Sequence, residues 1–180
     1  GSTADTDFFV SMGEMYADGL RHFNLLTEIR NSLDAHYIAF DDTAYPITLG
    51  VVYFMTGGIS DVFIPFIYKA FMGAAVPLLI YNIANRHFGE NVARIAGVFC
   101  MLNPNMIWWC ASMMKEADMI FFTTLYVDFM DKTLMSKRFS IQAIWPATLI
   151  GMWVFLYRAA LGAVCFLALM TTIVLASNRI

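Results

Sequence analysis

The chain has 180 residues, of which 59% are hydrophobic and only 14% are charged, and its mean hydropathy is +0.63. Soluble domains are usually about 45–50% apolar and about 25% charged. The formal net charge of −3 excludes the basic footprint of a nucleic-acid-binding domain. The hydrophobic surplus lies in long blocks, which is typical of membrane-spanning helices.

The cysteines give no sign of a disulfide framework or a zinc site. The chain has three of them, Cys100, Cys110 and Cys165, and all lie in apolar runs. An odd number without the spacing of metal ligands predicts neither kind of site.

The first third of the chain is predicted to be amphipathic. Residues 5–33 carry apolar side chains at spacings of three and four with charges between them, which predicts a helix broken at Gly19. The apolar segments nearby favour a place at the membrane interface over packing on a core. Residues 34–46 are predicted to form an extended polar loop, because the residue before Pro46 disfavours helix.

The apolar segment 47–56 has only ten residues. A helix needs roughly 20 residues to cross the hydrocarbon core of a bilayer. We therefore predict a re-entrant or interfacial helix here, with a short tilted span as the alternative.

Longer apolar runs are predicted to be transmembrane helices. They cover residues 62–84, 93–114, 117–130, 139–157 and 159–176. A sheet would leave backbone groups unpaired in lipid, so we predict an all-α, polytopic membrane protein with about five transmembrane helices. Residues 1–60 would form an outer-face loop with juxtamembrane helices, and residues 61–180 the transmembrane bundle.

Two features interrupt these runs. Lys69 lies near one end of the first, where it is expected to face the bundle or to extend along the helix towards the interface. Asn103-Pro104-Asn105 lies in the second half of the second. The proline frees backbone groups, which must then be satisfied by protein or water and not by lipid.

Charges between the runs fall into two sets. One contains Arg86, Lys132, Lys137, Arg138 and Arg179, and the positive-inside rule assigns it to the cytoplasm. The other set then faces outward and contains Asp5, Asp7, Asp41, Asp42, Lys115, Glu116, Asp118 and Arg158. Carboxylates that remove a proton or hold a metal would thus lie beside cations that hold a phosphate. This grouping requires that residues 47–56 do not cross the membrane.

Several short motifs follow one another in a characteristic order. They are Asp5-Thr6-Asp7-Phe8-Phe9, Tyr45-Pro46, Thr56-Gly57, Arg86 to Gly89, Pro104 and Lys115-Glu116-Ala117-Asp118. This order resembles the GT-C glycosyltransferases, which use polyprenyl-phosphate-linked sugars, and within them the protein mannosyltransferase and aminoarabinose transferase group. The resemblance covers nearly the whole chain and depends on order and spacing. Thr6 and Phe9 depart from the Asp-Glu-x-x-Tyr pattern of the family's first motif.

The resemblance implies an enzyme that moves a sugar from a polyprenyl-phosphate donor to a glycan, lipid or protein acceptor with inversion of configuration. It implies Asp5 as the base towards the acceptor hydroxyl, Asp7 as the second choice, and Glu116 as a further acid in the site. It also implies a bacterial inner-membrane protein whose active face is periplasmic. The chain would be the N-terminal part of a longer enzyme, inactive alone.

The leaving phosphate needs a cation. The resemblance implies that Arg158 and Lys115 supply it, or that a divalent metal ion held by Asp5 and Asp118 does so; no other cofactor is implied.

Each of these residues also has a purely structural interpretation. Asp5 would be a helix cap, Glu116 would end a span, and Arg158 would extend towards the interface. The alternative functions are a non-catalytic membrane transporter or assembly subunit, and a polymerase or ligase of surface polysaccharide. Convergence of Asp5 or Asp7 with Glu116 and Arg158 around one cavity would favour the glycosyltransferase.

Overall fold

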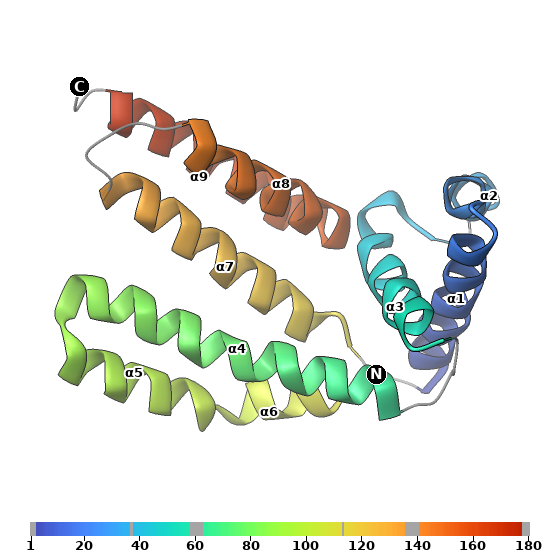
Figure 1. The fold of residues 1–180 in the computed structure, drawn as a ribbon, viewed down its shortest axis with the longest axis horizontal. Helices are drawn as coiled ribbons and strands as arrows, with labels where there is room; N and C mark the ends of the chain where they lie inside the picture. Colours follow the sequence, from blue (N-terminus) through green and yellow to red (C-terminus); the bar gives the residue numbers. More distant parts are fainter. Residues whose placement is uncertain (1–2, 37, 58–62, 113, 136–140, 178–180) are drawn as a thin grey trace.

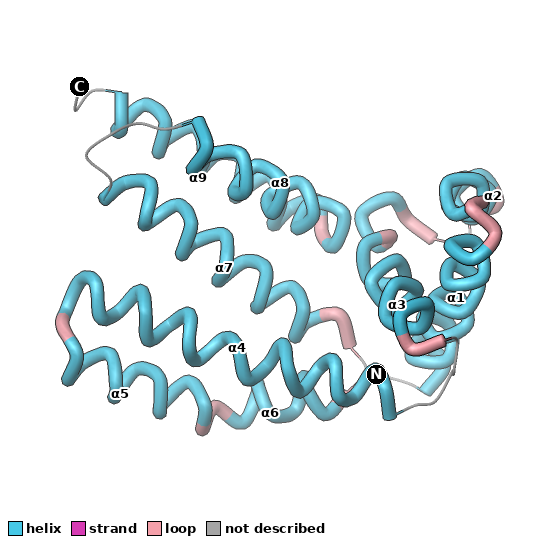
Figure 2. The backbone as a smooth tube through the Cα atoms, viewed as in Figure 1, coloured by secondary structure: helices cyan, strands magenta, loops and turns pink. Residues whose placement is uncertain are grey.

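The computed structural model describes residues 3–36, 38–57, 63–112, 114–135 and 141–177 (Figure 1). Side chains are described from residue 7 to residue 174, except those of the gaps and of residues 141–143. Every regular element within these ranges is a helix (Figure 2), which confirms the all-α prediction. The elements are α1 (Thr3–Arg21), α2 (Leu25–Asp34), the 3-10 turn η1 (Phe40–Asp42), α3 (Ala44–Met55), α4 (Phe63–Phe88), α5 (Glu90–Met101), α6 (Pro104–Ala111), α7 (Glu116–Met135), α8 (Ile141–Tyr157) and α9 (Ala159–Ser177).

The helices form two groups. Helices α4, α7, α8 and α9 run along the long axis, with α5 and α6 beside α4, and we call α4–α9 the bundle (Figure 1). Helices α1, α2 and α3 lie together at one end of it, and we call them the cap. The cap meets the bundle where α3 contacts α4 and α8. The division of the chain at residue 60 stays a prediction.

The break in the N-terminal helix comes after Gly19, not at it. Helix α1 continues to Arg21, and Phe23 turns the chain with a positive φ of 57°. Gly19 permits this turn, since a Cβ there would lie 3.2 Å from the Cα of Leu25. The backbone N–H of Asn24 donates to the Gly19 carbonyl at 2.7 Å. The glycine therefore allows α2 to start against the last turn of α1.

The prediction of an extended loop over residues 34–46 is wrong at both ends. Asp34 is the last residue of α2, and α3 already starts at Ala44. Pro46 lies in the first turn of α3, where a missing N–H has no intrahelical partner to lose. Between them, η1 carries Asp41 and Asp42 on a tight turn.

Helix α3 packs closely along α1. A Cβ at Gly50 would lie 2.8 Å from the Cβ of Tyr16, and one at Gly13 would lie 2.9 Å from the Cβ of Leu49. The two glycines therefore let the helix backbones approach. The segment 47–56 thus lies within the cap, beside α1 (Figure 1).

The expected continuous span over residues 93–114 is wrong. Helix α5 ends at Met101, and α6 starts afresh at Pro104. The side chain of Asn103 caps α6 by accepting the N–H of Asn105 at 3.0 Å, and proline is favourable at the first helical position. The interruption is therefore a helix start. Two short helices result, both against α4.

One helix in the described ranges, α4, is long and apolar enough to cross a bilayer. Helix α3 and two stretches, Ile144–Tyr157 and Ala159–Val174, are shorter apolar helices. The expectation of about five transmembrane helices therefore stays a prediction.

Candidate functional site

A buried ion pair joins α4 to α7 beneath the cap. The ammonium of Lys69 donates to Asp118 Oδ2 at 2.6 Å and to the carbonyl oxygen of Met114 at 2.7 Å. Both charged side chains are 0% exposed. The ammonium also lies 4.3 Å from the centroid of the Tyr45 ring, a geometry that adds cation–π attraction. A charge this deep requires such partners, because its transfer from water costs several kcal/mol.

Tyrosines surround this pair. The hydroxyls of Tyr157 and Thr48 are hydrogen-bonded at 2.9 Å, which ties α8 to α3. The hydroxyl of Tyr68 faces Asp118 but does not meet hydrogen-bond geometry. Three helices and the start of α7 thus share one polar cluster inside an otherwise apolar protein.

A second charged group lies nearer the surface. Lys115, at the junction of α6 and α7, forms an ion pair with Asp42 of η1. Arg158, from the junction of α8 and α9, is close enough to act on the charge of Lys115. Burial first, and then Arg158, lower the pKa of Lys115, while Glu116 and Asp41 act in the opposite direction. We call these five residues the outer cluster.

The structure brings together some of the predicted site residues. Glu116 and Arg158 are close enough to Lys115 for their charges to act on its pKa; Glu116 is half-buried and Arg158 is exposed. Asp7 is exposed on α1 and forms no hydrogen bond or ion pair with these three. Asp5 also belongs to α1, but its side chain lies outside the described part.

The N-terminal end of α1 reaches the buried pair. The ring of Phe9 packs edge-on against Tyr45 with centroids 5.1 Å apart. Position 5 lies one turn earlier on the same face of α1, whereas position 7 points elsewhere, because residues two apart do not share a helix face.

Asp118 does not lie at the surface beside Glu116, where the sequence predicted it. It is buried in the first turn of α7, where Oδ2 pairs with Lys69 and Oδ1 has no hydrogen-bond partner among the described residues. Among the described residues, no group of three or more His, Cys, Asp or Glu side chains is arranged to hold a metal ion. A metal bound by Asp5 and Asp118 therefore stays a prediction.

Sequence reasoning did not find the partner of Lys69, and it placed Asp42 on the outer face without giving it a role in the site. A signal for the first was present, since an ionisable residue within an apolar helix usually pairs with another. The choice of partner was not visible, because Lys69 and Asp118 are 49 positions apart and Asp42 and Lys115 are 73 apart.

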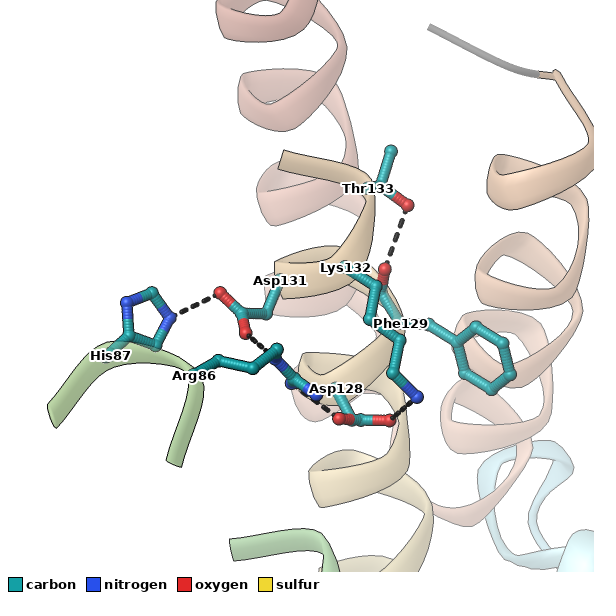
Figure 3. A network of polar contacts seen from close by, with 7 residues as sticks. All are labelled: Arg86, His87, Asp128, Phe129, Asp131, Lys132 and Thr133. Atoms are coloured by element: carbon teal, nitrogen blue, oxygen red, sulfur yellow. Dashed lines mark hydrogen bonds and ion pairs between the residues drawn. The ribbon is translucent and has the colours of Figure 1, made fainter. Parts of the chain in front are cut away.

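A different network joins α4 to α7 at the far end of the bundle (Figure 3). Arg86 donates to Asp128 Oδ1 at 2.6 Å and to Asp131 Oδ2 at 2.7 Å. Lys132 donates to the other oxygen of Asp128 at 2.6 Å, and His87 contacts Asp131 Oδ1 at 2.6 Å. We call this the inner network. It contains two basic residues, Arg86 and Lys132, of the set that the charge bias assigns to the cytoplasm.

The two charged regions are well separated along α7. Asp118 and Asp131 are thirteen residues apart in one helix, or roughly 20 Å at 1.5 Å per residue. The outer cluster and the inner network therefore lie at opposite ends of the bundle, with an apolar middle between them.

Comparisons with known proteins add no family. No family model matches the chain, and neither a curated protein nor a solved structure matches it.

Proposed function

We propose that this chain is the membrane part of a glycosyltransferase that moves a sugar from a polyprenyl-phosphate donor to an acceptor at the outer face of the membrane. The observation that supports it most is the outer cluster. Lys115 pairs with Asp42 of η1 at the end of the bundle that the cap covers, and the charges of Glu116 and Arg158 act on it there.

The reaction needs two kinds of group. As the acceptor oxygen attacks the anomeric carbon, the bond from that carbon to the phosphate oxygen breaks and the acceptor proton passes to a base. Glu116 is a half-buried carboxylate at this place. The departing polyprenyl phosphate carries the electron pair away and needs a cation. Lys115 already has Asp42 as partner, so the exposed Arg158 is the cation best able to meet the phosphate.

The N-terminal acid stays part of the proposal. Phe9 brings the first turns of α1 to the polar cluster, and position 5 shares the face of Phe9. We propose Asp5 either as the base, with Glu116 then supporting the acceptor, or as the group that orients the acceptor while Glu116 is the base. Asp7 is the second choice for the role of Asp5.

Apolar surface supports a membrane location. Large side chains on α4, α5 and α9 are exposed, among them Phe71, Phe99 and Leu167. An apolar groove of about 510 Å³ lies between α4, α5 and α6, and Gly73, Met106 and Cys110 are among its lining residues. Such a groove suits a hydrocarbon chain. We propose that the protein spans the bacterial inner membrane with the cap at the periplasmic face and the inner network in the cytoplasm.

One observation favours a different function. The pairs Lys69–Asp118 and Lys115–Asp42 neutralise each other within the protein. Ion pairs of this kind also occur where charges only hold helices together. A non-catalytic membrane subunit, such as a transporter or assembly component, is therefore the second candidate.

Sugar transfer by the full-length protein distinguishes the two. The protein would be placed in nanodiscs with radiolabelled polyprenyl-phosphate hexoses and pentoses, and release of polyprenyl phosphate would be measured. Glu116→Gln should lower the rate by about 10²–10⁴-fold, the range of acid–base catalysis. Glu90→Gln, an exposed acid at the far end of the bundle, is the matched control and should leave the rate unchanged. Absence of release by the wild-type protein would favour the non-catalytic function, whereas a wild-type rate in Glu116→Gln would exclude Glu116 from the reaction.

A further inference from the structure

Lys69 makes two hydrogen bonds, one at each end of a short segment. Its ammonium binds the carbonyl oxygen of Met114 and the carboxylate of Asp118, at 2.7 and 2.6 Å. The residues between these two points are Lys115, Glu116 and Ala117. A single buried side chain on α4 thus holds both ends of the segment that carries the outer cluster.

The bond to Met114 is not needed to start α7. The first backbone bond of the helix runs from the N–H of Met119 to the carbonyl of Lys115, and Asp118 in the first turn already interacts favourably with the helix dipole. The Met114 carbonyl lies before the helix, where the chain arrives from α6. Lys69 therefore fixes the direction in which the chain enters α7.

Joining two helices through a buried lysine costs desolvation free energy. Apolar side chains of similar volume often replace a buried ion pair without loss of stability. An apolar residue at position 69, however, could not bind a backbone carbonyl. The second bond gives the lysine a role that packing alone would not provide.

We propose that Lys69 is a positioning residue, whose ammonium fixes residues 114–118 and so directs Lys115 and Glu116 towards Asp42 and Arg158. The effect on sugar transfer rests on the proposed function. The positioning itself does not.

Two variants separate positioning from simple charge pairing. Lys69→Met removes both bonds and leaves Asp118 as an unpaired buried charge. Lys69→Met/Asp118→Asn removes that charge as well but still leaves the Met114 carbonyl unbound. Asp118→Asn alone keeps a donor at position 69 for Met114. Lys132→Met, at the far end of α7, is the matched control.

Hydrogen exchange of the full-length protein in nanodiscs gives a readout that is independent of activity. Amides in peptides covering residues 114–119 should exchange about tenfold faster or more in both Lys69 variants, as expected for loss of a hydrogen bond from a charged donor. Exchange there should rise less in Asp118→Asn than in Lys69→Met/Asp118→Asn, and it should stay near the wild-type rate in Lys132→Met.

Three results would overturn the positioning role. The first is wild-type exchange at residues 114–119 in Lys69→Met/Asp118→Asn, and the second is equally fast exchange in Asp118→Asn. The third is global unfolding of both Lys69 variants, which would make Lys69 a stability residue.

If instead the segment loosens while wild-type protein shows no sugar transfer, the proposed function fails and the positioning role stands. If exchange in the Lys69 variants is unchanged but Glu116→Gln abolishes sugar transfer, the positioning role fails and the proposed function stands.

Discussion

Helices α4 and α7 are joined by charges at both ends, but the two connections differ in kind. At the cap end, one lysine and one aspartate are both 0% exposed, with tyrosines around them. At the far end, Asp128 is 2% exposed but Lys132 is 54% exposed, and each carboxylate has two basic partners. The buried pair has no substitute for a lost partner. The inner network is redundant and partly screened by water.

The two ends of the bundle also use charge differently. The inner network is satisfied within itself and ties helix ends together. The outer cluster combines a bonded cation, Lys115, with an exposed one, Arg158, and a half-buried acid, Glu116. Groups of opposite charge that are only partly satisfied by each other have capacity for a ligand. We therefore expect substitutions at the far end to change stability, and substitutions at the cap end to change function as well.

The largest effect on stability is expected at the buried pair. Asp118→Leu leaves the ammonium of Lys69 without its counter-charge and should lower the free energy of unfolding by about 3–5 kcal/mol. Denaturant titration of the protein in detergent micelles, followed by circular dichroism, measures this loss. The double variant Lys69→Met/Asp118→Leu should recover most of it. A double variant no more stable than Asp118→Leu would show that the pair is not a self-contained unit.

A smaller effect is expected for Asp128→Asn in the inner network. Arg86 keeps Asp131 as a partner, and Lys132 is mostly in water, so the loss should be about 1–3 kcal/mol, as for hydrogen bonds to a charged group. The same titration measures it. A loss as large as that of Asp118→Leu would contradict the redundancy of the network.

The smallest effect is expected for Lys132→Met. Its ion pair with Asp128 spans one turn of α7 on a largely exposed side chain, so it should contribute at most about 1 kcal/mol. The contribution should shrink when the titration is repeated at 1 M salt, where the Debye length falls to about 3 Å. A difference from wild type that does not change with salt would argue against an electrostatic origin.

The sequence predicted the class of fold because long apolar runs leave little choice but helix. It failed at Pro104 and Pro46, which were treated as features that disturb or exclude a helix. Both instead lie in first turns, where proline costs little. The signal was available in the capping residue Asn103, which precedes the first of them.

For the site, the charge bias assigned Lys115, Glu116 and Arg158 to one face, and in the structure the charges of Glu116 and Arg158 act on Lys115. It did not separate Asp118 from Glu116, because depth within a bundle depends on which neighbour covers each face of a helix. Only the packing of α4 on α7 shows that one carboxylate is enclosed and the other is not.

The central claim is that the cap end carries the reaction and the far end does not. The most direct test removes the positive charge of one arginine at the cap end and, separately, of one lysine at the far end. Both variants of the full-length protein are placed in nanodiscs, and release of polyprenyl phosphate from a labelled polyprenyl-phosphate sugar is measured. Arg158→Gln should lower the rate by about 100-fold or more, the loss expected when a charge-stabilising group is removed, whereas Lys132→Gln should leave it at the wild-type value. Equal rates in the two variants would contradict the account.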